Sequence, residues 1–116
     1  MWLAYAMKEN FSGKPVKTVT INLSVSDLQS TGTSTTQIDL SNYISPDINV
    51  IKIEGYYLPP SDCPSLYKDK KFIIYTSHTD QIGVIRHNGS KWVMNIAQSS
   101  SGSNKGSGFA KIYYVE

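Results

Sequence analysis

Residues 82–96 read Ile-Gly-Val-Ile-Arg-His-Asn-Gly-Ser-Lys-Trp-Val-Met-Asn-Ile, two apolar runs joined by a polar turn. Asn-Gly between two such runs is typical of a β-hairpin with a type I′ turn. A two-residue turn at Asn88 and Gly89 predicts a register in which Ile85 lies opposite Trp92. One face of the predicted hairpin carries the core residues Ile85, Trp92, Met94 and Ile96, and the other carries Val84, Arg86, Lys91 and Val93.

Outside this hairpin, the clearest period of two lies in residues 18–26. In residues 18–26, aliphatic residues alternate strictly with polar ones, which predicts a strand with one buried and one exposed face. Further strands are predicted over residues 37–40, 48–58, 71–76 and 109–116, separated by turns rich in proline, glycine and serine. The sequence therefore predicts an all-β domain, an antiparallel β-sandwich, jelly-roll-like or immunoglobulin-like, of about six to eight strands.

Length and composition agree with one domain. The chain has 116 residues, of which 40% are hydrophobic and 17% charged, and sixteen serines and eight threonines supply much of the polar surface. This composition excludes a coiled coil, a collagen repeat, a disordered chain and a disulfide-rich toxin. We expect residues 16–116 to form the single β-sandwich domain. Residues 1–15 are expected to be an N-terminal arm or the end of a preceding segment.

Residues that usually carry catalysis or bind metals are few and scattered. Cys63 is the only cysteine, which excludes an intrachain disulfide and a paired-cysteine metal site. No nucleotide-binding, calcium-binding or hydrolase motif occurs. His78 and Asp80 would lie on the same side of a strand and are the best acid–base candidates, although a polar turn explains them better. We therefore expect a non-enzymatic protein with no catalytic residue, no metal and no cofactor.

The charge and hydropathy of the chain indicate whether it binds nucleic acid or enters a membrane. The net charge is +2, and the basic residues are spread along the chain, so nucleic-acid binding is not expected. A single-strand-binding barrel would need aromatic and basic residues interleaved on one face, for which Lys71-Phe72 and Lys91-Trp92 are weak signs. No apolar run approaches the roughly 20 residues that cross a membrane. We expect a soluble chain without membrane insertion.

Tyrosine is frequent, with eight residues that include adjacent pairs at positions 56–57 and 113–114. Neighbouring residues of a strand point to opposite faces, so each pair can place one ring in the core and one at the surface. Exposed rings stack on sugar faces or anchor protein contacts. The ligand-binding surface is therefore predicted to include Tyr57, Tyr75 and Tyr114, together with Arg86 and Lys91, which face each other in the predicted hairpin.

Several of these segments together resemble the C-terminal β-sandwich head domains of bacteriophage tail fibres and related tail proteins. The matching features are the Thr/Ser-rich strand 18–26, the hairpin 85–92, the Gly/Ser-rich loop 99–108 and the aromatic strand 109–116. The resemblance implies a structural protein of the virion, located in the phage tail. It also implies a homo-oligomer, with a trimer favoured, that recognises a saccharide or a protein on the host surface.

Two other functions remain open on the sequence. A free-standing carbohydrate-binding module of a bacterial protein would be a monomer with a planar strip of exposed aromatic rings, and a small hydrolase would use His78 and Asp80. The hydrophobic pattern of two segments also favours oligomerisation. Apolar residues occupy both phases of 48–58 and 84–93, which indicates more burial than one thin sandwich supplies. Contact between subunits would provide the missing cover.

Overall fold

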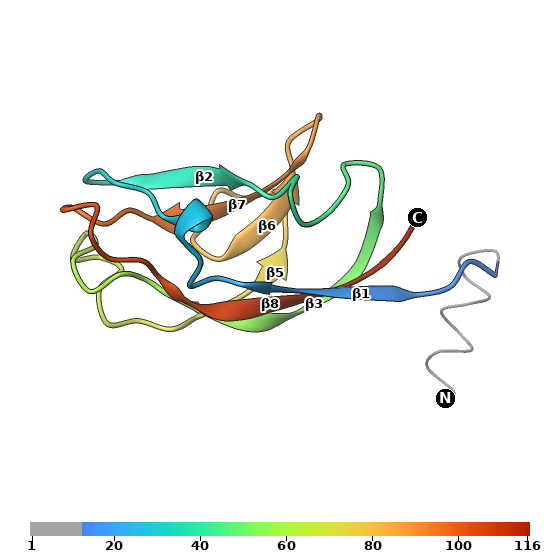
Figure 1. Cartoon of the computed structure of the whole chain (residues 1–116), viewed down its shortest axis with the longest axis horizontal. Helices are drawn as coiled ribbons and strands as arrows, with labels where there is room; N and C mark the ends of the chain where they lie inside the picture. The colour runs from blue at the N-terminus through green and yellow to red at the C-terminus, as the bar shows by residue number, and fades with distance from the viewer. Residues whose placement is uncertain (1–12) are drawn as a thin grey trace.

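The computed structural model describes residues 13–116, which form two β-sheets packed face to face (Figure 1). The predicted all-β sandwich is confirmed, with eight strands and one short 3-10 turn in this part of the chain. The elements are β1 (Lys17–Asn22), η1 (Ser26–Leu28), β2 (Thr35–Asp39), β3 (Asn49–Leu58), β4 (Phe72–Ile73), β5 (Tyr75–Thr76), β6 (Val84–His87), β7 (Trp92–Ala97) and β8 (Ser107–Val115). The predicted arm over residues 1–15 falls almost entirely outside the described residues.

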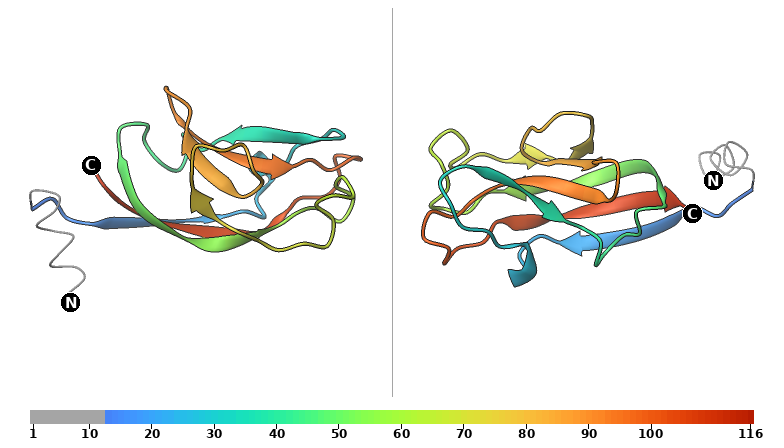
Figure 2. Two further views of the ribbon diagram at one scale, coloured as in Figure 1. Left: turned by 180° about the vertical axis from the view of Figure 1, so that it is seen from behind. Right: turned by 90° about the horizontal axis from the view of Figure 1, so that it is seen from above.

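The two sheets have the strand orders β1-β8-β3-β4 and β2-β7-β6-β5, and Figure 2 shows them as two layers. β1 pairs with β8 and β2 with β7, as the outer strands of a jelly roll do, whereas β3 pairs with β4 and β5 with β6. In an immunoglobulin domain the first strand would instead pair with the second. All strand pairs are antiparallel except the short parallel pair of β5 and β6.

Alternation along the strands places the core between the sheets. In β1, Val19 and Ile21 face inward, opposite Ile112 and Ala110 of β8. The second sheet contributes large inward residues, of which the most buried are Ile85, Met94, Ile96 and Trp92. Val19 and Ile21, together with the hairpin residues Ile85, Trp92, Met94 and Ile96, therefore lie on the buried face, as the sequence predicts.

The hairpin of β6 and β7 is present, but its register differs from the predicted one. Ile85 lies opposite Met94, and Arg86 lies opposite Val93, so the predicted pairing of Arg86 with Lys91 is wrong. The observed partner of each β6 residue lies two positions beyond the predicted one. A shift of two positions keeps every side chain on the same face, which is why the predicted core face is nonetheless correct.

The reason for the shifted register is the position of Asn88 in the turn. Its backbone N–H donates to the carbonyl oxygen of Lys91 at 3.0 Å, so Asn88 begins the turn and Gly89 and Ser90 occupy its centre. The side-chain oxygen of Asn88 accepts hydrogen bonds from the backbone N–H groups of Ser90 and Lys91, both at 3.0 Å. Gly89 has a φ of 103°, as a type II′ turn requires at its first central position.

The predicted strand over residues 71–76 consists of two short strands in different sheets. β4 pairs with β3 in the first sheet, whereas β5 pairs with β6 in the second. Between them, the buried Ile74 donates its backbone N–H to the carbonyl oxygen of Gly55 at 3.1 Å. The chain therefore crosses from one sheet to the other at Ile74 and connects the two layers along this edge.

The apolar outer face of β6 and β7 is covered within the same chain. Val84 and Val93 are 0% and 3% exposed. The segment between β5 and β6 lies over this face, because its Asp80 pairs with Arg86 of β6 at 2.7 Å and accepts a hydrogen bond from Gln37 of β2 at 3.4 Å. The burial of these valines is therefore explained without a neighbouring subunit.

Candidate functional site

A pocket of about 620 Å³ opens beside the crossing between β4 and β5. It is lined by three aromatic rings, two isoleucines and three polar side chains, namely Tyr67, Phe72, Tyr75, Ile73, Ile82, Lys71, Asp80 and Gln81. The crossing of the chain from one sheet to the other brings these side chains together. β4 and β5 frame the pocket, while the segments just before β4 and just after β5 supply the remaining side chains.

The side chains of the pocket are held by contacts with one another. The rings of Tyr67 and Phe72 pack at a centroid distance of 6.2 Å with an interplanar angle of 58°. The hydroxyl of Tyr75 donates to the side-chain oxygen of Gln81 at 2.7 Å. Aromatic rings accept the apolar C–H faces of sugars, and amide, carboxylate and ammonium groups hydrogen-bond sugar hydroxyls. The arrangement suits a saccharide better than a purely apolar ligand.

The acid–base pair that a hydrolase would need is not assembled. The carboxylate of Asp80 contacts Arg86 and Gln37, and no hydrogen bond joins it to His78 within residues 13–116. His78 is exposed and does not line the pocket. The geometry therefore offers no support for hydrolysis by His78 and Asp80.

Of the three tyrosines predicted to bind a ligand, only Tyr75 lies in the pocket, where it is 42% exposed. Tyr57 is 2% exposed and donates its hydroxyl to the carbonyl oxygen of Ala97 at 3.2 Å across the core. The expectation that Tyr57 presents an exposed ring is wrong, because its position in the alternation of β3 directs the side chain between the two sheets. Tyr114 is half-buried and lines a separate hollow of about 380 Å³ beside Tyr43.

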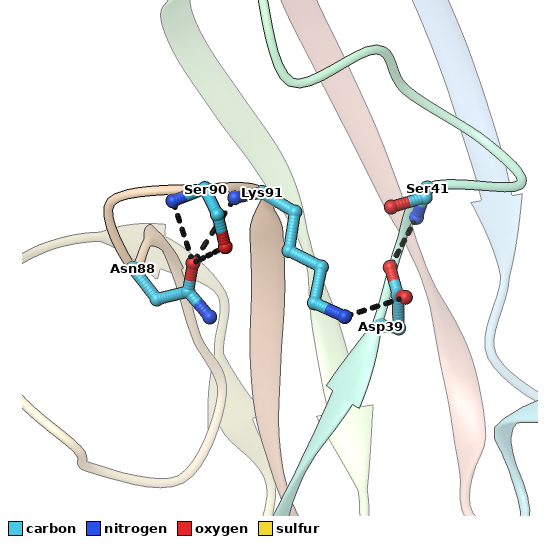
Figure 3. Close-up of polar contacts among 5 residues, drawn as sticks. All are labelled: Asp39, Ser41, Asn88, Ser90 and Lys91. Carbon is cyan, nitrogen blue, oxygen red and sulfur yellow. Dashed lines mark hydrogen bonds and ion pairs between the residues drawn. The ribbon is translucent and has the colours of Figure 1, made fainter.

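The two predicted basic residues are paired with carboxylates in different places. Arg86 forms an ion pair with Asp80, which lines the pocket, while Arg86 itself does not line it. Lys91 donates to the carboxylate of Asp39 at 3.0 Å, at the end of β2 (Figure 3). The predicted surface formed by Tyr57, Tyr75, Tyr114, Arg86 and Lys91 is therefore not one site.

Asp39 gives a test of this local geometry. The hydroxyl and the backbone N–H of Ser41, together with the Lys91 ammonium group, lower the pKa of Asp39 to about 2 (Figure 3). Because this folded-state pKa lies below the ordinary value of 3.8, its contribution to stability is present above pH 3.8 and is lost as the pH falls through about 2.

We expect NMR titration of the Asp39 carboxyl to show a midpoint of about pH 2 in the native protein. Ser41→Ala should raise this pKa more than Lys91→Ala, because the hydrogen bond from the Ser41 hydroxyl is the largest of the three effects. A midpoint of about 4 in the native protein, or no upward shift in Ser41→Ala, would contradict the geometry described here.

Tyr57 and Tyr114, which were predicted to bind a ligand, are the inward members of their tyrosine pairs. Tyr56 and Tyr113 are the outward members, on the solvent face of the first sheet. The signal that could have found them is strand phase. Tyr113 shares its phase with Lys111, and Tyr56 shares its phase with Lys52 and Glu54. Charged residues mark the solvent face of a strand, so the tyrosines in their phase are the ones that lie on that face.

Comparisons of the chain with known protein families, with curated proteins and with solved structures find no match. Over residues 13–116, no helix is long and apolar enough to cross a membrane. The same residues contain no group of three or more histidine, cysteine or acidic side chains that could hold a metal ion. The geometry of the pocket is therefore the main basis for a functional proposal.

Proposed function

We propose that this chain is a non-enzymatic binding domain of a bacteriophage tail fibre or related tail protein, which recognises a saccharide on the host surface. The observation that carries the proposal is the pocket between β4 and β5, where aromatic rings stand beside amide, carboxylate and ammonium groups. This combination matches the apolar faces and hydroxyl edges of a sugar. The placement in a phage tail rests on the resemblance of the strand, hairpin and loop segments to tail-fibre heads.

The alternative is a free-standing carbohydrate-binding module, which would use the same pocket. The observation that favours it is the burial of Val84 and Val93 within a single chain, since this removes one reason to expect subunit contacts. Light scattering after size exclusion separates the two proposals. A trimer supports the tail-fibre head, and a monomer at both low and high concentration supports the binding module.

We expect Tyr75→Ala to weaken saccharide binding at least tenfold, or by about 1.4 kcal/mol, because it removes the exposed ring and its hydrogen bond to Gln81. Tyr75→Phe keeps the ring and should lose only a few-fold in affinity. The measurement is a screen of host-surface polysaccharides on an array, followed by isothermal titration with the best ligand.

The matched control is Tyr43→Ala, which removes a half-buried ring that lines the separate hollow. This variant should bind the saccharide as the native chain does, provided that thermal unfolding shows it to be folded. Unchanged affinity in Tyr75→Ala, or equal losses in the two alanine variants, would reject the pocket as the binding site. Absence of binding to every polysaccharide tested would reject saccharide recognition.

A further inference from the structure

The outer face of the β1-β8-β3-β4 sheet combines aromatic, aliphatic and basic side chains. The outward residues of β3 and β8 pair across the sheet, so that Tyr56 lies opposite Phe109 and Lys52 opposite Tyr113. Phe109 is 39% exposed, and Ile73 of β4, which lies opposite Tyr56, is 64% exposed. We call this surface the lysine–aromatic face.

Three lysines lie over the tyrosine rings of this face. The ammonium group of Lys71 is 4.6 Å from the ring centroid of Tyr56. Those of Lys52 and Lys111 are 4.8 and 5.1 Å from the ring centroid of Tyr113. Such cation–π contacts hold a positive charge against an aromatic ring and leave it accessible to an anion. The face therefore presents several positive charges on an apolar floor.

The charge of this face is not balanced by acidic residues. Glu54 is the only acidic side chain among the outward positions of β1, β3, β4 and β8. Its carboxylate already accepts a hydrogen bond from Tyr113 at 2.6 Å and lies 3.6 Å from the Lys52 ammonium group. A second copy of the chain stacked on this face would bring like charges together, so the complementary partner is an anion.

The face is continuous with the pocket. Lys71 and Ile73 line the pocket, and both also contact or adjoin Tyr56 on the outer face. A polysaccharide with one sugar unit bound in the pocket would therefore continue over the lysine–aromatic face. On β1 the outward residues Thr18 and Thr20 are exposed and can hydrogen-bond hydroxyl groups.

We propose that the lysine–aromatic face binds an acidic polysaccharide, with its carboxylate groups at Lys52, Lys71 and Lys111 and its sugar rings against the exposed side chains of Phe109 and Ile73. This proposal rests on the proposed function, because it names the class of saccharide that the pocket and its extension take. Single-stranded nucleic acid fits less well. Base stacking needs open ring faces, whereas lysines lie over the rings of Tyr56 and Tyr113.

The test compares alginate, a carboxylate polysaccharide, with neutral dextran of similar length and with a single-stranded oligonucleotide. We expect the native chain to bind alginate at least tenfold more tightly than dextran, with an affinity that falls as salt is raised. The double variant Lys52→Gln/Lys111→Gln should lose at least tenfold in alginate affinity. The control Lys68→Gln/Lys70→Gln removes the same charge from an exposed loop and should stay within twofold of the native chain.

The outcomes distinguish the proposal for the lysine–aromatic face from the proposal for the pocket. Loss of alginate binding in Tyr75→Ala but not in the Lys52/Lys111 double variant would overturn the face and leave the pocket standing. Loss in the double variant alone would support the face and reject the pocket as its anchor. Equal losses in the face and loop variants would show a general charge effect and overturn the proposal, as would tighter binding of the oligonucleotide than of alginate.

Discussion

Gly55→Ala is expected to lower the free energy of unfolding by about 3 kcal/mol or more, which combines backbone strain with overpacking. Gly55 lies in β3 opposite Ala110 and has a φ of 145°, a conformation that other residues rarely adopt. A Cβ atom there would overlap the carbonyl oxygen of Phe109 and lie 2.9 Å from the carbonyl carbon of the same residue. Because both obstacles are backbone atoms, the two strands would have to separate.

Gly89→Ala is the matched control for this prediction. Gly89 also has a positive φ, of 103°, but no atom lies within 4 Å of the position of an added Cβ. Its replacement should therefore show backbone strain alone, about 1 kcal/mol, in urea unfolding followed by circular dichroism. Equal destabilisation of the two variants would mean that β3 and β8 do not approach as closely as described.

Tyr57→Ala is expected to destabilise the fold by about 3–5 kcal/mol, as the loss of a fully buried aromatic ring usually does. The ring lies in the core, and its hydroxyl joins β3 to β7 through the carbonyl oxygen of Ala97. Tyr57→Phe keeps the ring and should cost about 1 kcal/mol for the lost hydrogen bond. Tyr56→Ala, one residue earlier on the solvent face, should cost no more than about 1 kcal/mol.

A pH series gives an independent check on Tyr57. Burial raises the pKa of its hydroxyl well above the ordinary value of 10. The fold therefore favours the neutral phenol, and the stability from this group is present below pH 10 and is lost as the pH rises above it. When the pH is raised from 9 to 11, the free energy of unfolding should therefore fall less in Tyr57→Phe than in the native chain. Similar effects of Tyr56→Ala and Tyr57→Ala on unfolding would contradict the assigned faces.

The parts of the fold that could be predicted are those that local alternation determines. Residues 18–26 carry a clear period of two, and β1 has the predicted inward residues Val19 and Ile21, although it ends at Asn22. The predicted strand over residues 109–116 is present in β8, but Tyr114, which was predicted to be exposed, packs against the core. The hairpin was predicted with the correct faces and the wrong register. Its sequence fits both turns, and the choice depends on hydrogen bonds that the side chain of Asn88 makes.

The crossing at Ile74 could not be read from the sequence. Residues 72–75 form one continuous apolar run, and nothing in that run marks a change of sheet. The break exists because the backbone of Ile74 pairs with Gly55, which lies far away in the sequence. The pocket is a product of this crossing, so only Tyr75 of the five residues predicted to form the ligand-binding surface lines it.

The place of β8 in the first sheet has a consequence for biosynthesis. β8 lies between β1 and β3, so each of these earlier strands lacks its main partner until residues 107–115 have left the ribosome. The nascent chain must therefore keep its first strand unpaired while almost all of the domain is made. Assembly of this sheet is expected to follow translation rather than accompany it, and chains that stop before β8 should be substrates for chaperones and proteases.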